Sequence, residues 1–240
     1  MCGRIVQKTN LGNVVSNLGM DSSEAIASGL VDRAPRYNIA PGASILAVRS
    51  NSNFSYLKWG LIPSWAKDPK IGFKLSNARS ETVQEKPSFR SAFKARRCVI
   101  PVDGFYEWKL QDGKKKPYFI HCSDEELLLL AGLWESWRSP TGEEIETCCV
   151  LTTSAVLPIQ SIHDRMPVFV KRRDLEEWLG PETNSKKLTS IFSPSNTLAE
   201  IILTPVSSVV NSATIDNESC IAHNESEPLH ARSYQRTLLN

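Results

Sequence analysis

A pair of strand-forming runs joined by a tight-turn dipeptide constrains the fold of this chain most. Residues 103–108 read DGFYEW, and the return strand at residues 117–121 reads PYFIH. The dipeptide Asp112-Gly113 stands between them, and Asp-Gly is favoured in two-residue hairpin turns, where both positions need a positive φ angle. The sequence therefore predicts an antiparallel β-hairpin in the middle of the chain.

Further strand and helix patterns extend this prediction to a whole fold. Strands are expected at residues 2–7, 44–48, 54–59, 98–101, 127–134, 147–153 and 168–170, with an extended segment at residues 200–210. Helices are expected at residues 10–19, 87–95, 174–179 and 185–192, with a helical turn at residues 154–161. The strands are mostly in hairpin order and no long linker divides them. We therefore expect a single α+β domain, residues 1–221, around a largely antiparallel, barrel-like β-sheet with short peripheral helices, followed by a polar, mobile tail, residues 222–240.

Composition excludes several classes of protein. The 240 residues are 41% hydrophobic and 22% charged, which suffices for a substantial globular core. No run approaches the ~18 apolar residues of a membrane helix, and the start lacks the basic-then-apolar pattern of a signal peptide. We expect a cytoplasmic monomer with no membrane partner.

The cysteine pattern indicates reduced thiols. None of the cysteines stands in C-x-x-C spacing, and an adjacent pair does not suit an intramolecular disulfide. We therefore expect neither disulfides nor a zinc site, and no cofactor. The six cysteines are Cys2, Cys98, Cys122, Cys148, Cys149 and Cys220.

Charge is divided unevenly along the chain. Residues 1–120 hold 19 basic and 9 acidic side chains, a net charge of +10, whereas residues 121–240 hold 9 and 17, a net of −8. The most basic window is residues 86–97, which contains no acidic residue. A basic half favours a polyanion such as nucleic acid, although halves of a sequence need not be faces of a fold.

The second residue carries the most specific chemistry. If Met1 is removed, Cys2 presents an α-amine and a thiol on adjacent carbons, which no internal cysteine can do. An α-amine has a pKa of about 8, so part of it is a free nucleophile at neutral pH. Such a 1,2-aminothiol suits an aldehyde, because the amine forms an imine and the thiol then closes a thiazolidine ring. The plainer reading is that Cys2 only begins the first strand.

Two other segments offer candidate functional side chains. Alternation along residues 103–108 puts Glu107 between aromatic neighbours, where a carboxylate is a candidate for proton transfer. Trp65 lies in a loop bracketed by prolines and is expected to be partly exposed. Residues 76–81 (SNARSE) lack both strand and helix periods and are predicted to form a loop.

Six motifs together resemble one known family, the SOS response-associated peptidase (SRAP) family. They occur in the family's order over residues 2–221, and no motif position departs from its pattern. The motifs are MCGR (1–4), YNIAPG (37–42), WGLIPSW (59–65), SNARSE (76–81), DGFYEW (103–108) and IHDRMP (162–167).

The resemblance implies the SRAP fold and a sensor of abasic sites in single-stranded DNA. It implies that Cys2 becomes linked to the lesion as a thiazolidine after Met1 removal by self-processing, with lyase-type chemistry, and so shields the lesion during the DNA damage response. Cys2 would be the nucleophile, Glu107 the acid/base and His163 a proton donor that favours reversal. Asn77 would position the Cys2 terminus and a phosphate. We expect such a protein to be associated with the nucleoid while it is bound to DNA.

The resemblance also implies a set of DNA contacts. Arginine suits bidentate phosphate contact, and an exposed aromatic ring suits base stacking. The implied DNA-binding residues are Arg4, Pro41, Trp65, Asn77, Arg79 and Thr152.

Two other classes of function remain open. One is a thiol peptidase that acts on other proteins with a Cys2/His163 dyad, which needs the thiol but not the free amine. The other is a non-catalytic single-strand binding module, which would bind intact and abasic strands alike.

Overall fold

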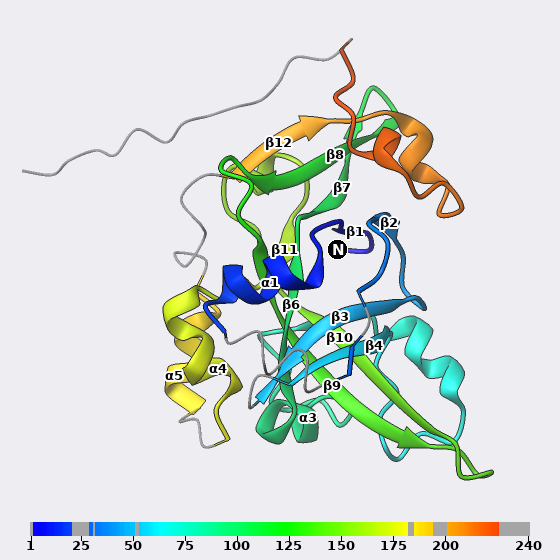
Figure 1. Ribbon diagram of the computed structural model, residues 1–240, viewed down its shortest axis with the longest axis vertical. Coiled ribbons are helices and arrows are strands. Elements are labelled where there is room, and N and C mark those ends of the chain that lie inside the picture. The colour runs from blue at the N-terminus through cyan, green and yellow to red at the C-terminus, as the bar shows by residue number, and fades with distance from the viewer. Residues whose placement is uncertain are drawn as a thin grey trace, which may run out of the picture.

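The computed structural model describes residues 2–20, 29–30, 32–50, 53–181, 185–193 and 201–225, arranged as two sheets that meet near the N-terminus (Figure 1). One sheet has five strands in the order β12 (Ile201–Pro205), β8 (Lys114–Cys122), β7 (Gly104–Gln111), β1 (Ile5–Gln7) and β2 (Arg36–Ile39). The second is built from β3 (Ser44–Arg49), β4 (Phe54–Trp59), β6 (Arg97–Val102), β9 (Leu128–Arg138) and β10 (Glu144–Ser154).

The second sheet closes on itself. Its strand order is β10-β4-β3-β6-β9, and β9 also pairs antiparallel with β10 over seven residue pairs, from Glu144↔Arg138 to Val150↔Gly132. Two short strands, β5 (Asn77–Arg79) and β11 (Arg165–Pro167), are added to β10. The predicted α+β fold around a barrel-like, largely antiparallel sheet is therefore confirmed.

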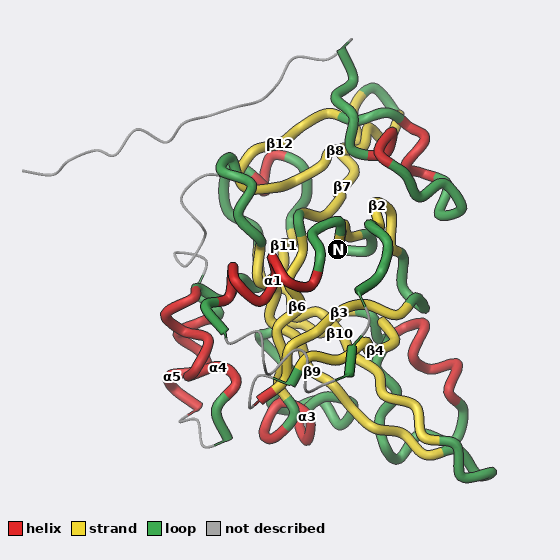
Figure 2. Tube along the Cα trace, in the orientation of Figure 1, coloured by secondary structure: helices red, strands yellow, loops and turns green. Residues whose placement is uncertain are grey.

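Helices are short and lie at the periphery, as Figure 2 shows in red. They are α1 (Leu11–Leu18), α3 (Arg90–Ala95), α4 (Leu175–Leu179) and α5 (Ser185–Ile191), with 3₁₀ turns η2 (Pro69–Lys74), η3 (Ile159–Ser161), η4 (Arg172–Asp174), η6 (Ser208–Asn211) and η7 (Glu218–Cys220). Among the described helices, none is long and apolar enough to cross a membrane.

Local sequence signals explain the elements that were predicted correctly. The hairpin turn has Asp112 at φ 51° and Gly113 at φ 72°, as a two-residue turn of this kind requires. Helix α1 begins where the Asn10 side chain accepts a hydrogen bond from the Asn13 N–H and ends at Gly19, which has a left-handed φ of 67°.

Elements held by distant partners were predicted less well. Residues 76–81 were expected to be a loop, but β5 forms there because it pairs in parallel with β10. The strand expected at residues 168–170 is present only as an isolated bridge between Phe169 and Leu130 of β9, and neither β11 nor β2 was expected. The first strand begins at Ile5 rather than at residue 2, and the expected extended segment at 200–210 turns into η6 after β12.

The chain still contacts the five-stranded sheet beyond residue 221. His223 forms an isolated bridge with Val206, and the Asn224 N–H donates to the Pro205 carbonyl at 2.8 Å. Residues 222–225, which the sequence assigned to the tail, are thus attached to the fold. Residues 226–240 lie outside the described part of the chain.

The apolar core explains how the two sheets are joined. One buried cluster contains Cys2, Ile5 and Phe105 from the five-stranded sheet side together with Leu57 and Val150 of the barrel. A second cluster covers the opposite face of the five-stranded sheet. Cys2 therefore lies in the layer between the sheets rather than at the surface.

Candidate functional site

Cys2 is fully buried, just before a strand that pairs with the strand of Glu107, and it lies close enough to Glu107 to feel its charge. Strand β1 pairs antiparallel with β7, with Ile5 opposite Phe105 and the Tyr106 N–H donating to the Arg4 carbonyl at 3.0 Å. Burial raises the pKa of the Cys2 thiol far above its ordinary value, and the nearby Glu107 carboxylate raises it further. The thiol therefore keeps its proton at neutral pH in this arrangement.

Asn77 ties Cys2 to the barrel. Its Nδ2 donates a hydrogen bond to the Cys2 carbonyl oxygen at 2.8 Å. Strand β5 carries Asn77 opposite Val150 of β10, so barrel strands fix the position of this amide. The Asn77 Oδ1 is buried and accepts no hydrogen bond from the described residues. A buried acceptor is thus held close to Cys2.

Glu107 is 3% exposed and lies on the face of β7 that points toward the barrel. Phe105, two residues earlier on the same face, belongs to the core cluster that contains Cys2, whereas Tyr106 lies in the cluster on the other face. The alternation predicted for this strand is confirmed. A buried carboxylate therefore stands in the same layer as the Cys2 thiol.

His163 precedes β11, and neighbouring groups of the chain contact the Nδ1 atom of its ring. Its Nδ1 accepts a hydrogen bond from the Arg165 N–H at 2.9 Å. The same nitrogen lies 2.8 Å from a carboxylate oxygen of Asp164, a contact that is a hydrogen bond only when Nδ1 itself carries a proton, whereas the bond from Arg165 needs Nδ1 without one. In the neutral ring the proton is therefore on Nε2. Ile162 and Met166 on either side of this segment belong to the core cluster that contains Cys2.

Arg165 joins two of the sequence motifs, a role that the sequence did not reveal. Its guanidinium contacts both carboxylate oxygens of Glu81, at 2.5 and 2.9 Å, and donates to the Thr152 carbonyl at 2.7 Å. The hydrogen bond from Arg165 lowers the pKa of Glu81. Thr152 is fully buried, and its hydroxyl reaches the Ala78 carbonyl at 3.4 Å. Thr152 is thus placed as a support for β5 and Arg165.

Arg4 also has partners within the chain. Its Nη1 donates to Asn38 Oδ1 at 2.6 Å and to the Val210 carbonyl at 2.8 Å, and its guanidinium lies 5.8 Å from the Trp108 ring centroid. Asn38, 1% exposed, in turn donates to the carbonyls of Ser212 and Ile215. Sequence reasoning missed Asn38, since the carbonyls that its amide binds lie more than 170 residues away.

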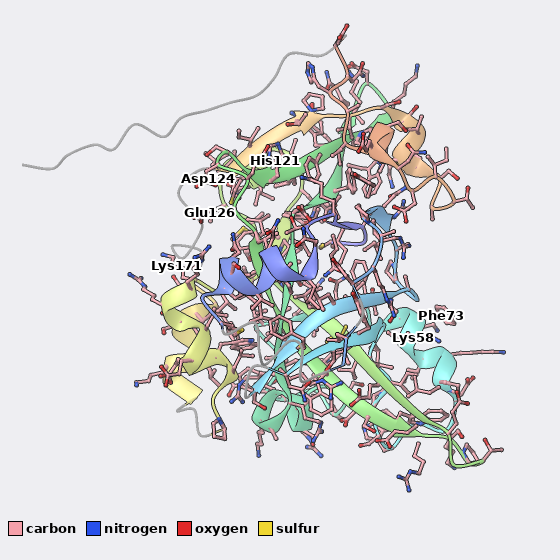
Figure 3. All side chains as sticks on the ribbon, in the orientation of Figure 1. Lys58, Phe73, His121, Asp124, Glu126 and Lys171 are labelled. Carbon is pink, nitrogen blue, oxygen red and sulfur yellow. The ribbon has the colours of Figure 1, made fainter. Side chains whose placement is uncertain are left out.

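Exposed aromatic residues lie on a loop at the edge of the barrel. Trp65 is 58% exposed, as expected, and Phe73, which the sequence did not single out, is 68% exposed. Phe73 lies against the Pro41-Gly42 turn, because a Cβ added at Gly42 would be 3.6 Å from its ring. Figure 3 shows Phe73 pointing away from the molecule at the edge that also carries Lys58. Arg79, at the end of β5, is exposed.

Two glycines hold this loop in place. Gly60 and Gly72 approach so closely that a Cβ at Gly72 would lie 2.7 Å from the Gly60 carbonyl oxygen. The Leu61 N–H also donates to the Leu75 carbonyl at 3.1 Å, which closes the loop at its base. Close backbone contact therefore fixes the base of the aromatic loop, and an apolar cluster of Ile62, Ala66 and Trp137 adds to it.

The basic residues in the window at residues 86–97 are divided between the interior of the fold and its surface. Arg97 is buried and donates to the carbonyls of Phe93 and Trp178, and Arg96 contacts Glu135 at 2.7 Å. These two arginines stabilise the fold. The remaining basic residues, Lys86, Arg90 and Lys94, are exposed.

The described residues contain no group of three or more His, Cys, Asp or Glu side chains that could hold a metal ion. All six cysteines are free thiols, and all are buried. Cys2 is therefore distinguished from the others by its position in the chain and by its neighbours Asn77 and Glu107.

Comparisons with known proteins agree with one another. A family model described as SOS response associated peptidase (SRAP) matches residues 1–213. The chain is 41% identical over 217 residues to the abasic site processing protein YoqW of Bacillus subtilis (strain 168), covering 88% of this chain and 95% of that protein. It is 36% identical over 190 residues to the abasic site processing protein HMCES of Gallus gallus, covering 69% of this chain and 56% of that protein.

A solved structure shares the fold. A protein from Bacteroides thetaiotaomicron superposes with a TM-score of 0.81 at 25% sequence identity, covering 93% of this chain and all of that one. The family match spans the barrel, the five-stranded sheet and the segment that holds Arg4. The chain belongs to the SOS response associated peptidase (SRAP) family.

Proposed function

We propose that this protein processes abasic sites in single-stranded DNA and, once Met1 is removed, becomes covalently attached to them through Cys2. The observation that carries the proposal is the position of Cys2, buried between two sheets with its carbonyl bound by Asn77 and its thiol beside Glu107. Relatives named abasic site processing proteins, at 36–41% identity, support the same substrate.

The chemistry follows from the two nucleophilic atoms of a free N-terminal cysteine. The open form of an abasic deoxyribose carries an aldehyde at C1′. The Cys2 amine adds to this carbon to give a carbinolamine, which loses water to give an imine. The thiol then adds to the imine carbon, its proton passes to the nitrogen, and a thiazolidine ring results. These steps need no oxidant, reductant or metal.

The buried polar groups have distinct tasks in this scheme. Loss of water from the carbinolamine needs a proton donor, and we assign this role to Glu107, because its carboxylate is close enough to act on the Cys2 thiol. Asn77 holds the Cys2 carbonyl, and its Oδ1 offers an acceptor for the freed α-amine. His163 donates a proton during ring opening from its imidazolium form, which Asp164 contacts at Nδ1, and is left as the neutral ring. An imine also permits cleavage of the strand at the lesion, which accounts for lyase-type activity.

The DNA strand crosses the exposed edge of the barrel. Trp65 and Phe73 stack on bases next to the lesion, and the adjoining Pro41 limits how the strand turns. Arg79 binds a phosphate, because it is exposed on the strand that carries Asn77. Arg4 reaches a phosphate while it keeps its contacts to Asn38 and Val210, and Thr152 acts through Arg165.

Peptidase activity is restricted to the chain's own N-terminus. A thiol peptidase that attacks other proteins needs an accessible thiolate, whereas the Cys2 thiol is fully buried and its pKa is raised by burial. Release of Met1 from its own chain is the proteolytic step that this geometry favours. A mass spectrum of the purified protein reports whether Met1 is absent.

The deciding experiment is adduct formation with an abasic oligonucleotide, measured on a denaturing gel. Cys2→Ala is expected to abolish the adduct while binding of the intact strand is kept. Cys122→Ala, at another buried thiol, is the matched control and is expected to form the adduct as the wild type does. A protein with an uncleavable N-terminal extension keeps the Cys2 thiol but has no free amine there, and it is expected to form none. A stable adduct with the extended protein would refute the thiazolidine scheme.

A further inference from the structure

The β7–β8 hairpin continues past the reactive site, and its register divides the side chains between two faces. Glu107 lies opposite Tyr118, Lys109 opposite Lys116, and Gln111 opposite Lys114. Because strand side chains alternate, Lys109 and Lys114 share the face of Glu107. In Figure 1 the hairpin extends away from the N-terminus toward the end of the molecule that carries β12.

The other face of the same hairpin has a different environment. Trp108 lies on it, and its indole N–H donates to Asn211 Oδ1 at 2.7 Å. The C-terminal segment, residues 208–221 with η6 and η7, therefore covers this side. Lys115 pairs with Leu110 and shares the face of Trp108. The hairpin therefore presents lysines on two faces, and only one of these faces also carries Glu107.

The positions of Lys109 and Lys114 leave their ammonium groups available to bind phosphate. Lys114 is exposed and Lys109 is half-buried, and within the described part of the chain neither forms an ion pair. Register puts Lys109 directly opposite Lys116, and like charges in that position are destabilising. At a rise of about 3.4 Å per residue, Lys109 lies ~7 Å beyond Glu107, and the Gln111–Lys114 pair lies ~14 Å beyond it.

We propose that Lys109 and Lys114 form a phosphate-binding track that holds the DNA strand flanking the abasic nucleotide as it leaves the reactive site. The inference rests on the proposed function, because it takes the lesion to lie at Cys2 and Glu107. The DNA strand is then held at two places, by base stacking at the barrel edge and by the charges of Lys109 and Lys114 on the hairpin. The track contacts phosphates only and is therefore independent of sequence.

The test compares Lys109→Gln/Lys114→Gln with Lys115→Gln in a salt titration of binding to an intact single-stranded oligonucleotide. Each lost phosphate contact lowers the slope of log K against log salt by about 0.7, so the double variant is expected to lose ~1.4. Lys115→Gln removes a lysine from the same hairpin on the other face and is expected to keep the wild-type slope. A wild-type slope in the double variant, or equal losses from Lys115→Gln, would overturn the proposal.

A sugar without phosphates gives a second readout that damage to the reactive site would not produce. The double variant is expected to form the Cys2 adduct more slowly on a long abasic oligonucleotide but at the wild-type rate on free 2-deoxyribose, which offers the same aldehyde and has no flanking phosphate for Lys109 or Lys114 to bind. Equal slowing on both substrates would refute the track. Failure of the wild type to form any adduct would instead refute the proposed function, while the salt titration on the intact strand would still test the lysines.

Discussion

Asn38 is expected to decide whether the C-terminal segment keeps Arg4 in place. Its side-chain oxygen accepts from Arg4, and its amide nitrogen donates to the carbonyls of Val210, Ser212 and Ile215, at 3.2, 2.9 and 2.7 Å. Replacing Asn38 by Ala removes all four contacts at a side chain that is 1% exposed.

The expected cost can be worked out contact by contact. A buried polar group that loses its partner costs about 1–3 kcal/mol. Val210 keeps its bond from Arg4, and Ser212 and Ile215 lie in exposed or half-buried positions that water can reach. We therefore expect the free energy of unfolding to fall by about 2–4 kcal/mol, dominated by the loss at Arg4, which corresponds to a Tm lower by roughly 5–15 °C.

Calorimetry and amide hydrogen exchange together measure this effect. Exchange is expected to rise over η6 and η7, and the adduct with an abasic oligonucleotide is expected to form more slowly because Arg4 loses its support. Asn38→Asp is the matched control, since it keeps an oxygen for Arg4 but cannot donate to the three carbonyls. It should loosen the segment yet keep the orientation of Arg4. A wild-type Tm and wild-type exchange in Asn38→Ala would refute this reasoning.

Three further predictions concern other parts of the site. Glu107→Gln is expected to slow adduct formation by ~10²–10⁴-fold, whereas His163→Ala is expected to slow mainly the reversal of the adduct. Time courses of adduct formation measure the first effect, and transfer to a competing abasic strand measures the second. Wild-type rates in both variants would mean that both residues are structural. Gly72→Ala forces a Cβ to within 2.7 Å of the Gly60 carbonyl and is expected to cost about 1–3 kcal/mol in thermal unfolding and to weaken binding of intact strands, since the loop that carries Phe73 shifts; unchanged stability and binding would contradict this. Burial alone would raise the pKa of Asp216, but hydrogen bonds from Arg36 and from the Tyr37 N–H lower it, so Asp216 stabilises the fold above a pH of about 4 and this contribution is lost as the pH falls through the lowered value. Asp216→Asn should therefore flatten the acid limb of the stability curve, and an identical limb in wild type and variant would contradict the assignment.

The sequence predictions were accurate for segments that pair with a near neighbour in the chain and poor for segments that pair with a distant one. The β7–β8 hairpin was predicted because its turn needs only Asp112 and Gly113, which adopt the required angles themselves. Strand β5 was missed because its three residues carry no local period and are extended only through pairing with β10, more than 70 residues away. A pattern method cannot find a strand whose hydrogen bonds are supplied entirely by a remote partner.

The candidate site shows the same division. Candidates whose chemistry belongs to one residue could be proposed from the sequence, as with the aminothiol of Cys2 and the carboxylate in the aromatic strand. Roles that depend on a distant contact were not, and Asn38, Glu81 and Arg165 were found only through their partners. The basic window was ambiguous for the same reason, because two of its arginines bind carbonyls and a carboxylate within the fold.

The attachment of Cys2 to both sheets has a chemical consequence. The main chain next to Cys2 pairs with β7, and the Cys2 carbonyl accepts from Asn77 of the barrel strand β5. A carbonyl oxygen takes no part in aminothiol chemistry, so Cys2 is fixed through the one polar atom that the proposed reaction does not use. A loosely held N-terminal cysteine would also react with aldehydes, but its amine and thiol would sample many orientations and the ring would close slowly. Pairing of β5 with β10, which positions Asn77, is therefore expected to matter for the proposed reaction as well as for stability.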